Sequence, residues 1–319
     1  MINPTIIVAG ANGVIGAALV AQLLRSGCRV IGLYRVGARW HRPQPQSARN
    51  FYPVEVHAFE CAILLRALDG LDAGSLVNCV GAGVAPDERD SETLWRGNVS
   101  TVSALMAVAA AKGIERVIHT GSEAEYGRGA AGVLISESHP ILPYSEYGAA
   151  KAASVCYATA LAQSLSVKLV VLRPFYVYGF GERSHRLLPS IAAAKRSGKS
   201  VPMSRGEQMR DLLYVDDAVG AYVAAIDGAW HNDVSIYNVC SGKARRIRDV
   251  AELATRMFGV SPDALKWGTL PERETDASWI VGDPSRISGA LGWRSAMTLE
   301  QGIESWMRAY YTAQAVAMS

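Results

Sequence analysis

Short runs of β-branched and apolar residues alternate with alanine-rich stretches along the first half of the chain. Residues 5–8, 29–33, 75–80, 116–119 and 168–172 have the length and composition of buried strands. Between several of them, residues 17–25, 99–112 and 147–165 carry apolar side chains at helical spacing. This alternation predicts an α/β fold with a doubly wound parallel sheet, whose strands end at one ligand-binding edge.

The pattern loosens after Arg173-Pro174. We expect helices near 187–196, 216–226, 247–258 and 299–311, strands at 212–215 and 235–239, and a turn-rich stretch at 266–283. The pattern predicts a Rossmann-type domain over residues 1–174, to which 212–240 returns. Residues 175–211 and 241–319 would form a smaller, mixed α/β lobe.

Composition narrows the class of protein. The 319 residues are 50% hydrophobic and 19% charged, with a formal net charge of +3, as in an ordinary globular protein and without the charge of a nucleic-acid footprint. The five cysteines are scattered, which argues against a disulfide scaffold or a zinc module, and we expect no metal site. The same cysteine usage fits a reducing cytosol, so we expect a cytoplasmic protein, and no apolar run reaches the roughly 18 residues of a membrane span, so we expect no membrane contact.

A glycine-rich turn joins the first predicted strand to the first helix. It reads GANGVIG over residues 10–16. Glycines permit the tight turn and the close approach of a pyrophosphate to backbone N–H groups. We expect a dinucleotide cofactor here, held by Gly10, Asn12, Gly13, Val14, Ile15 and Gly16. The alternative is that the three glycines serve only the turn.

The end of the second predicted strand bears on which cofactor is bound. An acidic residue there typically binds the ribose hydroxyls of NAD, but the strand ends in Tyr34-Arg35, with Arg39, Arg42 and Arg49 nearby. A guanidinium pairs with a 2′-phosphate that a carboxylate would repel. Arg35 therefore favours NADP(H) over NAD(H), unless these arginines form only a solvated loop.

A YxxxK motif and a serine after the strand at 116–119 indicate proton-transfer chemistry. Tyr147 and Lys151 lie four residues apart on a predicted helix, so they share a face. We expect the Lys151 ammonium to lower the pKa of the Tyr147 phenol, which would pass a proton to or from a substrate oxygen. Ser122 would hydrogen-bond the same oxygen.

Together these motifs resemble the extended short-chain dehydrogenase/reductase family, of the NAD(P)-dependent nucleotide-sugar epimerase/dehydratase type. The matching segments are GANGVIG (10–16), TGSEAEYG (120–127), PYSEYGAAK (143–151), LRPFYVYGFGE (172–182), GEQMRDLLYVDD (206–217), YNVCSG (237–242) and GDPSRISGALGW (282–293). The resemblance implies a catalytic set of Ser122, Tyr147 and Lys151, the last two also contacting the cofactor.

The resemblance also implies ligand contacts and an assembly. Asn98 corresponds to a cofactor contact, and Arg210 and Arg273 correspond to arginines that bind the substrate diphosphate. Glu123 and Tyr176 are expected to contact the substrate. The partner would be a nucleoside-diphosphate sugar, and the protein is expected to be a homodimer through the helices at 99–112 and 147–165.

The chain departs from the family pattern at three places. Tyr176 stands where the family has an asparagine that holds the sugar nucleotide, and 57–60 read HAFE where an aspartate often lies near the adenine. Ala124 replaces an acid that dehydratases carry two residues after the serine. The string TGSEAEYG is instead similar to the GSSAEYG of 4-keto-6-deoxyhexose reductases.

The favoured interpretation is an NADP(H)-dependent reductase of a nucleoside-diphosphate 4-keto(-6-deoxy) sugar, with Tyr147 as the general acid. The alternative is an NAD-dependent nucleotide-sugar 4-epimerase, which uses the same residues. Sugar-nucleotide dehydratases and non-catalytic cofactor-binding relatives are less favoured, the latter because Tyr147 and Lys151 are both present.

Overall fold

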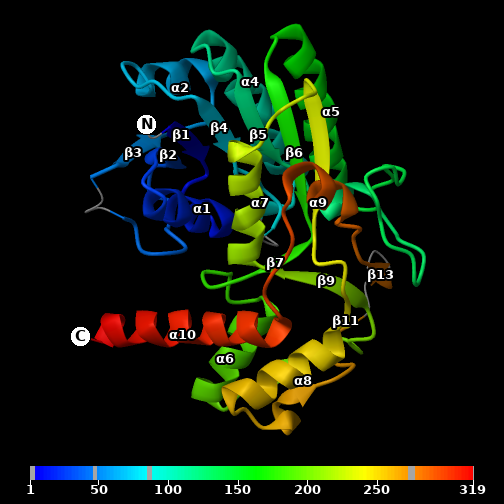
Figure 1. Ribbon diagram of the computed structural model, residues 1–319. Helices are drawn as coiled ribbons and strands as arrows, with labels where there is room; N and C mark the ends of the chain where they lie inside the picture. The colour runs from blue at the N-terminus through cyan, green and yellow to red at the C-terminus, as the bar shows by residue number, and fades with distance from the viewer. Residues whose placement is uncertain (1–3, 46–48, 85–87, 272–276, 319) are drawn as a thin grey trace.

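A seven-stranded parallel sheet forms the body of the larger domain in the computed structural model, which describes residues 4–45, 49–84, 88–271 and 277–318 (Figure 1). Its order is β10-β6-β5-β4-β1-β2-β3. The strands are β1 (Thr5–Ala9), β2 (Arg29–Arg35), β3 (Phe51–Val56), β4 (Ser75–Asn78), β5 (Arg116–Thr120), β6 (Lys168–Pro174) and β10 (Val234–Val239). The chain winds outward in both directions from the β1–β4 pair, so a ligand-binding crevice is expected beyond the carboxyl ends of these two strands. The predicted doubly wound fold is confirmed.

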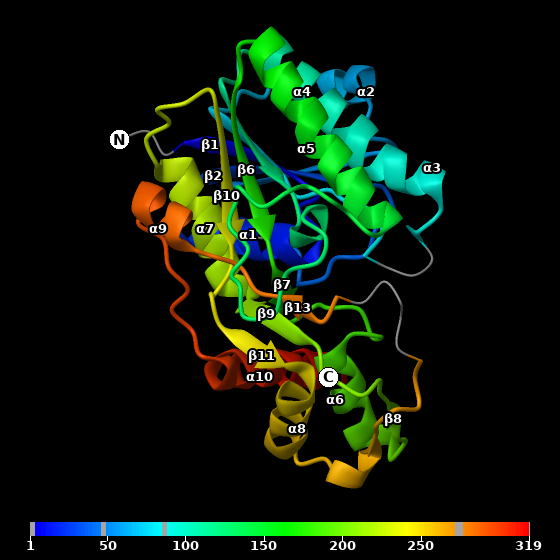
Figure 2. The same cartoon turned by 90° about the vertical axis from the view of Figure 1, so that its right-hand side faces the viewer.

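Helices cover both faces of this sheet. α1 (Val14–Arg25) and α7 (Val215–Asp227) pack on one face, while α2 (Cys61–Ala67), α4 (Thr101–Ala111) and α5 (Glu146–Ser164) cover the other (Figure 2). The short α3 (Ser91–Leu94) runs through a π-helical turn, η2 (Trp95–Ser100), into α4. Such turns are frequent at functional sites.

The strand at one edge of the sheet is not among the strands expected from the sequence pattern. β3 is the edge strand and carries Pro53 opposite Gly32 of β2. Its burial alternates, with Phe51 and Val56 buried, so it lacks the continuous apolar run of the inner strands. Proline is tolerated there because an edge strand leaves one row of N–H groups unpaired.

A smaller lobe follows β6. β7 (Tyr176–Tyr178), β9 (Met209–Tyr214), β11 (Ala244–Arg246) and β13 (Trp279–Ile280) form a four-stranded mixed sheet, and β8 (Val201–Pro202) pairs with β12 (Leu265–Lys266). The helices are α6 (Leu187–Ser197), α8 (Ile247–Phe258), α9 (Ser285–Leu291) and α10 (Leu299–Met318), with a 3₁₀ turn η4 (Pro262–Ala264). β9 overlaps the strand expected at 212–215 but ends at Tyr214, and it joins this small sheet, not the large one. Of 212–240, β10 is the part that pairs in the large sheet.

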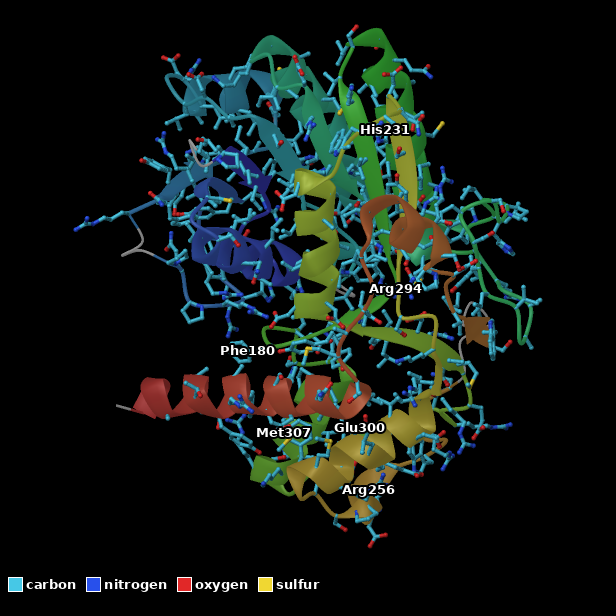
Figure 3. The ribbon with its side chains drawn as sticks, in the orientation of Figure 1. Phe180, His231, Arg256, Arg294, Glu300 and Met307 are labelled. Carbon is cyan, nitrogen blue, oxygen red and sulfur yellow. The ribbon has the colours of Figure 1, made fainter. Side chains whose placement is uncertain are left out.

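One apolar core runs continuously from the α1/α7 face of the large sheet into the smaller lobe. Phe258 of α8 and Trp306 of α10 meet edge to face at 5.4 Å within it, and Met307 packs against it (Figure 3). A second core lies on the α4/α5 face. In the part of the chain that the structure describes, no helix has the length and apolarity that a membrane span requires.

Candidate functional site

The glycine turn has the geometry that a dinucleotide pyrophosphate requires. Gly10 has φ +76°, and a Cβ there would lie 2.9 Å from the backbone of Cys79. A Cβ on Gly16 would overlap the Gly10 carbonyl oxygen, so Gly16 serves helix packing. Gly13 is the N-cap of α1, and since it has no side chain, it cannot accept a hydrogen bond from the amides of the first turn. The amides of the first turn therefore remain directed at the sheet edge, where they fit an anionic cofactor.

The arginine-rich segment folds back over this turn. The side-chain amide of Asn12 donates to the Arg39 carbonyl oxygen (3.0 Å), and the His41 ring contacts the Gly181 carbonyl oxygen of the other lobe. Arg42 forms an ion pair with Asp216 (3.1 Å) at the start of α7. Among the described residues, the exposed guanidinium of Arg35 at the end of β2 has no hydrogen-bond or ion-pair partner.

A rigid turn follows β5 and fixes Ser122. Ser122 is the N-cap of the 3₁₀ turn η3 (Glu123–Glu125), and its backbone N–H donates to Glu125 Oε1 (2.7 Å) in a capping box. Glu125 Oε2 accepts from Arg173 Nε (2.7 Å), and both side chains are buried. Burial raises the pKa of Glu125, and the Arg173 charge opposes that shift.

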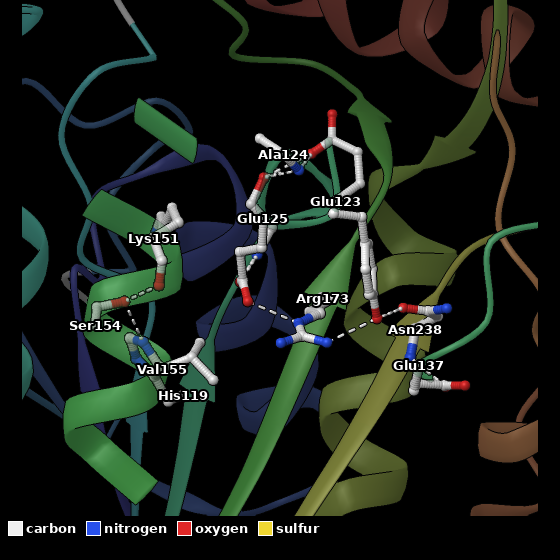
Figure 4. Close-up of polar contacts among 12 residues, drawn as sticks. His119, Glu123, Ala124, Glu125, Glu137, Lys151, Ser154, Val155, Arg173 and Asn238 are labelled. Carbon is white, nitrogen blue, oxygen red and sulfur yellow. Dashed lines mark hydrogen bonds and ion pairs between the residues drawn. The ribbon is translucent and has the colours of Figure 1, made fainter. Parts of the chain in front are cut away.

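The same arginine extends the network to β10. Arg173 donates to the Tyr126 hydroxyl (2.8 Å), which donates to the Asn238 side-chain oxygen (2.7 Å) (Figure 4). Asn238 in turn donates its backbone N–H to Glu137 (2.7 Å). The backbone of Ser122 is thus held by a chain of buried polar contacts across three strands, a signal that no local sequence pattern carries.

Glu123 is the other acid of η3, and it faces the cavity. Its Oε2 accepts from Ser122 Oγ (2.6 Å) and from the Ala124 N–H (2.7 Å). The serine proton is therefore directed at Glu123 in this structure, whereas the sequence predicted that it would point to a substrate oxygen.

α5 presents the tyrosine and the lysine. Ser145 caps the helix by accepting from the Gly148 N–H (3.1 Å), which places Tyr147 in the first turn and Lys151 one turn later. Lys151 Nζ donates to the Thr120 carbonyl oxygen (3.1 Å). Burial lowers the pKa of Lys151 to about 8, against the opposing charges of Glu125 and Cys79.

The expected effect of Lys151 on Tyr147 is wrong for this structure. Burial raises the pKa of the Tyr147 phenol well above its ordinary value, and the Glu123 charge adds to the rise. Contact with the Ser122 hydroxyl lowers it by less. The Lys151 ammonium lies against the Thr120 carbonyl and beside Gly81, so its charge does not dominate the phenol's environment.

A buried polar chain behind Lys151 was not predicted. The Val80 N–H donates to Asn78 Oδ1 (2.9 Å), which turns the Asn78 amide nitrogen toward His119 Nδ1 (3.1 Å). His119 Nε2 then donates to Ser154 Oγ (3.0 Å), and Ser154 donates to the Lys151 carbonyl oxygen (2.7 Å). Burial, with the Lys151 charge, lowers the pKa of His119 to about 3.

A cavity of about 1060 Å³ opens between the sheet edge and the smaller lobe. Glu123, Tyr147 and Tyr176 line it from one side, and residues of α6, β8 and the 204–208 stretch line it from the other. Arg186, which the sequence analysis did not single out, occupies the N-cap position of α6 without a capping side-chain bond, and its guanidinium lies over the Tyr176 ring, 4.3 Å from the ring centre. Its charge acts on both Tyr147 and Glu123.

The other residues predicted to contact the cofactor or the substrate bond backbone oxygens or lie outside the described residues. Arg210 is buried and donates to the carbonyl oxygens of Met209 (2.9 Å) and Ala277 (2.8 Å), and so holds β9 to its neighbour. Asn98, in η2, donates to the carbonyl oxygens of Leu94 (2.8 Å) and Ala82 (3.1 Å). Their ligand contacts stay predictions. Arg273 lies outside the described residues.

No metal site is evident at this edge or elsewhere in residues 4–45, 49–84, 88–271 and 277–318. Within those ranges, no group of three or more histidine, cysteine, aspartate or glutamate side chains could hold an ion.

Comparison with known proteins gives relatives along nearly the whole chain. A dTDP-6-deoxy-L-talose 4-dehydrogenase (NAD(P)(+)) of Kitasatospora kifunensis is 29% identical over 321 residues, covering 97% of this chain and 95% of the relative. The UDP-arabinose 4-epimerase 1 of Arabidopsis thaliana is 28% identical over 231 residues. That match covers 66% of this chain and only 54% of the epimerase.

Solved structures share the fold. MoeE5 in complex with UDP-glucuronic acid and NAD superposes with a TM-score of 0.85 at 24% identity, covering 97% of this chain and 99% of that one. A dTDP-glucose 4,6-dehydratase from Bacillus anthracis in complex with NAD gives 0.87 at 19% identity, covering 98% of both chains.

The family model of the NAD dependent epimerase/dehydratase family matches residues 6–240, which include the glycine turn, η3 and the Tyr147–Lys151 motif. The resemblance predicted from the sequence is confirmed, and with it an NAD(P)-dependent enzyme of the extended short-chain dehydrogenase/reductase type. The chain belongs to the NAD dependent epimerase/dehydratase family.

Proposed function

We propose that this protein is an NADP(H)-dependent reductase of a nucleoside-diphosphate 4-keto(-6-deoxy) sugar. The observation that carries the proposal is the placement of Tyr147, whose phenol lines the cavity of about 1060 Å³ together with Glu123, while burial and the Glu123 charge raise its pKa. A phenol that keeps its proton is suited to protonate an alkoxide as a ketone is reduced. It is less suited to begin a cycle by removing a proton from a sugar hydroxyl.

The residues have separate tasks in this reaction. The nicotinamide cofactor, when bound, supplies the hydride. Tyr147 donates its proton to the sugar O4, and the Ser122 hydroxyl, whose contact with the phenol lowers the pKa of Tyr147, keeps the phenol oriented. Lys151, fixed by the Thr120 carbonyl oxygen at the end of β5, would hold the nicotinamide ribose when the cofactor is bound, as the family resemblance implies.

The cavity supports a sugar nucleotide as the substrate. Arg186 stands at the N-terminus of α6 and contacts the ring of Tyr176, which lines the cavity, and an arginine beside helix amides suits a diphosphate. The relative from K. kifunensis is a dTDP-6-deoxy-L-talose 4-dehydrogenase, and dehydrogenation at C4 is the reverse of ketone reduction at C4.

NADP(H) is the proposed cofactor because of Arg35. Its exposed guanidinium stands at the end of β2, without a hydrogen-bond or ion-pair partner among the described residues, where the 2′-phosphate of NADP would lie. Arg42, by contrast, is paired with Asp216.

A 4-epimerase is the second candidate. It is favoured by the UDP-arabinose 4-epimerase relatives and by solved neighbours in complex with NAD. An epimerase regenerates its cofactor within each cycle and can keep it bound, whereas a reductase must exchange it.

The first experiment separates these two readings. The protein is purified without added nucleotide and denatured, and any released nucleotide is identified by chromatography. Protein without nucleotide that binds NADPH more tightly than NADH, and then oxidises NADPH with a nucleoside-diphosphate 4-keto sugar, supports the reductase. Stoichiometric NAD overturns it in favour of the epimerase.

We also propose a homodimer through α4 and α5, on the family resemblance. Tyr157 on α5 and Trp95 at the start of η2 are large hydrophobic side chains exposed in the single chain. Light scattering of the wild type and of Tyr157→Arg tests this proposal. A monomeric wild type would contradict it.

A further inference from the structure

A closed ring of hydrogen bonds joins the carboxyl ends of β4 and β5 to α5. All its side chains are buried, and its members in order are Asn78, His119, Ser154, Lys151 and Thr120. Thr120 closes the ring, because its hydroxyl donates to the Asn78 carbonyl oxygen (2.7 Å). Figure 4 shows the part from His119 to Lys151. The ring ties one level of α5 to two neighbouring strand ends.

Each bond on the His119 side of the ring has one possible direction. The Val80 N–H donates to Asn78 Oδ1, so the Asn78 amide nitrogen faces His119 and donates to its Nδ1. A ring nitrogen that accepts carries no proton, so the neutral ring has its proton on Nε2 and donates to Ser154 Oγ. Ser154 gives its only proton to the Lys151 carbonyl oxygen. The four groups therefore fit together in a single arrangement.

Lys151 is held by this ring at both of its ends. Its backbone carbonyl oxygen accepts from Ser154 (2.7 Å), and its Nζ donates to the Thr120 carbonyl oxygen (3.1 Å). On the other face of the sheet, the Tyr222 hydroxyl of α7 bonds Thr120 Oγ1 (2.9 Å), which fixes that strand end as well. The backbone of Lys151 is thus located by His119 through Ser154, separately from its ammonium group.

A polar ring at this place is a poor means of gaining stability alone. Its neutral side chains lose hydrogen bonds to water on folding, so the bonds formed inside the protein add little net stability. Apolar side chains of similar shape would pack between α5 and β5 without that loss. What a fully satisfied buried network adds is one fixed arrangement of its members. The placement of α5 is therefore the property to which this ring contributes most.

We propose that His119 is a positioning residue that fixes, through Ser154, the place of Lys151 at the sheet edge. The inference rests on the proposed function, in which Tyr147 donates the proton and Lys151 holds the nicotinamide ribose. Tyr147 lies one turn before Lys151 on α5, so a shift of this part of the helix displaces both side chains. A displacement of about 1 Å can lower a rate by about a hundredfold. His119 is 1% exposed and itself touches neither ligand.

The first test compares two replacements of His119 by kinetics, NADPH titration and thermal unfolding, each expressed per folded molecule. His119→Phe keeps a flat ring but can neither accept from Asn78 nor donate to Ser154. We expect kcat to fall by about 10–100-fold and the Kd for NADPH to rise by about threefold or more. His119→Gln keeps an acceptor and a donor, so its kcat and Kd should lie within about threefold of the wild type.

A double-mutant cycle tests the route through Ser154. Ser154→Ala should lower kcat about as much as His119→Phe, and the double variant should be little slower than either, because both substitutions cut the same chain. Thr159→Val is the matched control. The Thr159 hydroxyl donates to the Val155 carbonyl oxygen (2.9 Å) on the same helix but outside the ring, so kcat and Kd should stay at the wild-type values.

Nitrogen-15 NMR of the histidine rings provides a spectroscopic signature. The wild type should contain a neutral histidine protonated on Nε2 at pH 5, and this signal should be absent from His119→Gln. A His119 ring protonated on Nδ1 would reverse the bonds to Asn78 and Ser154 and overturn the inference.

The kinetic outcomes also separate this inference from the proposed reaction. Equal losses of kcat in His119→Phe and His119→Gln, or losses that add in the double variant, would show the inference to be wrong. So would a lower melting temperature with kcat and Kd unchanged, because His119 would then serve stability alone. A wild type that reduces no 4-keto nucleotide sugar overturns the reductase. The Kd of these variants, for whichever nicotinamide nucleotide the wild type binds, then still decides the role of His119.

Discussion

The carboxyl edge of the large sheet and the lobe across the cavity hold their charged groups in different ways. At the sheet edge, Glu125 and Arg173 bond each other and the backbone of Ser122, all buried. In the lobe, the Arg186 guanidinium lies 4.3 Å from the centre of the Tyr176 ring and forms an ion pair with Glu182 at 3.5 Å, and it is less buried than Arg173. A guanidinium over a ring face keeps N–H groups available at its edge. In the proposed function, the sheet edge therefore positions the reacting groups and the lobe binds the substrate.

The largest expected effect is on Tyr147. Tyr147→Phe should lower kcat by about 10²–10⁴-fold because the general acid is lost, with little change in melting temperature. Steady-state kinetics and thermal unfolding check this. Tyr144→Phe removes a hydroxyl from the same cavity and is the matched control. Equal losses in both variants would contradict the assignment.

The next effect concerns the stability of the sheet edge. Glu125→Gln should lower the free energy of unfolding by about 3–5 kcal/mol, because Arg173 is left buried without its counter-charge. Denaturant unfolding measures this. Glu123→Gln, in the same turn but facing the cavity, should change it by less than about 1 kcal/mol. Similar losses would remove the distinction between the two acids.

A pH-dependent effect should follow from His119. Its pKa is lowered to about 3 by burial and by Lys151, while the unfolded chain binds a proton near the ordinary 6.5. The unfolded state therefore gains protons first as pH falls, and stability declines from pH 6.5 toward 3. Between pH 7 and 5 this group alone should remove about 2 kcal/mol. Denaturant unfolding of His119→Gln at pH 7 and pH 5 should show a smaller loss of unfolding free energy than the wild type, by that amount. An equal loss in both proteins would contradict the role of His119.

Substitution of Arg186 in the smaller lobe should weaken binding of the nucleotide sugar. Arg186→Gln should raise KM for the nucleotide sugar about tenfold and change kcat less, because an arginine–phosphate contact contributes about 1.5–3 kcal/mol. Arg186→Lys, which keeps the charge but not the fork, should lie between wild type and Arg186→Gln. A fall in kcat without a change in KM would place Arg186 in the chemistry instead.

The smallest expected effect tests the cofactor. Arg35→Glu should weaken NADPH binding about tenfold or more and leave NADH within about threefold, since only NADPH has the 2′-phosphate. Fluorescence titration measures both. Arg49→Glu, on the same stretch, controls for the general charge. Equal losses for NADPH and NADH would contradict the proposed role.

Local patterns predicted the parts of the site that depend on local spacing. The glycine turn and the Tyr147–Lys151 pair are such features, since strand, turn and helix set their geometry. The chain from Asn78 through His119 to Ser154 joins three elements far apart in sequence, and only packing brings it together. The prediction that the pKa of Tyr147 is lowered was wrong for the same reason, because burial and the Glu123 charge raise it and only the fold brings these groups together.

The segment at 39–42 has a consequence for protein engineering. It contacts Asn12 at the turn, Gly181 in the other lobe and Asp216 on α7. Gly181 has φ +97°, and a side chain there would overlap the His41 carbonyl oxygen. A chimera that imports another relative's 35–45 loop to change cofactor preference must therefore import the matching 179–182 segment, because the two form a single exchangeable unit.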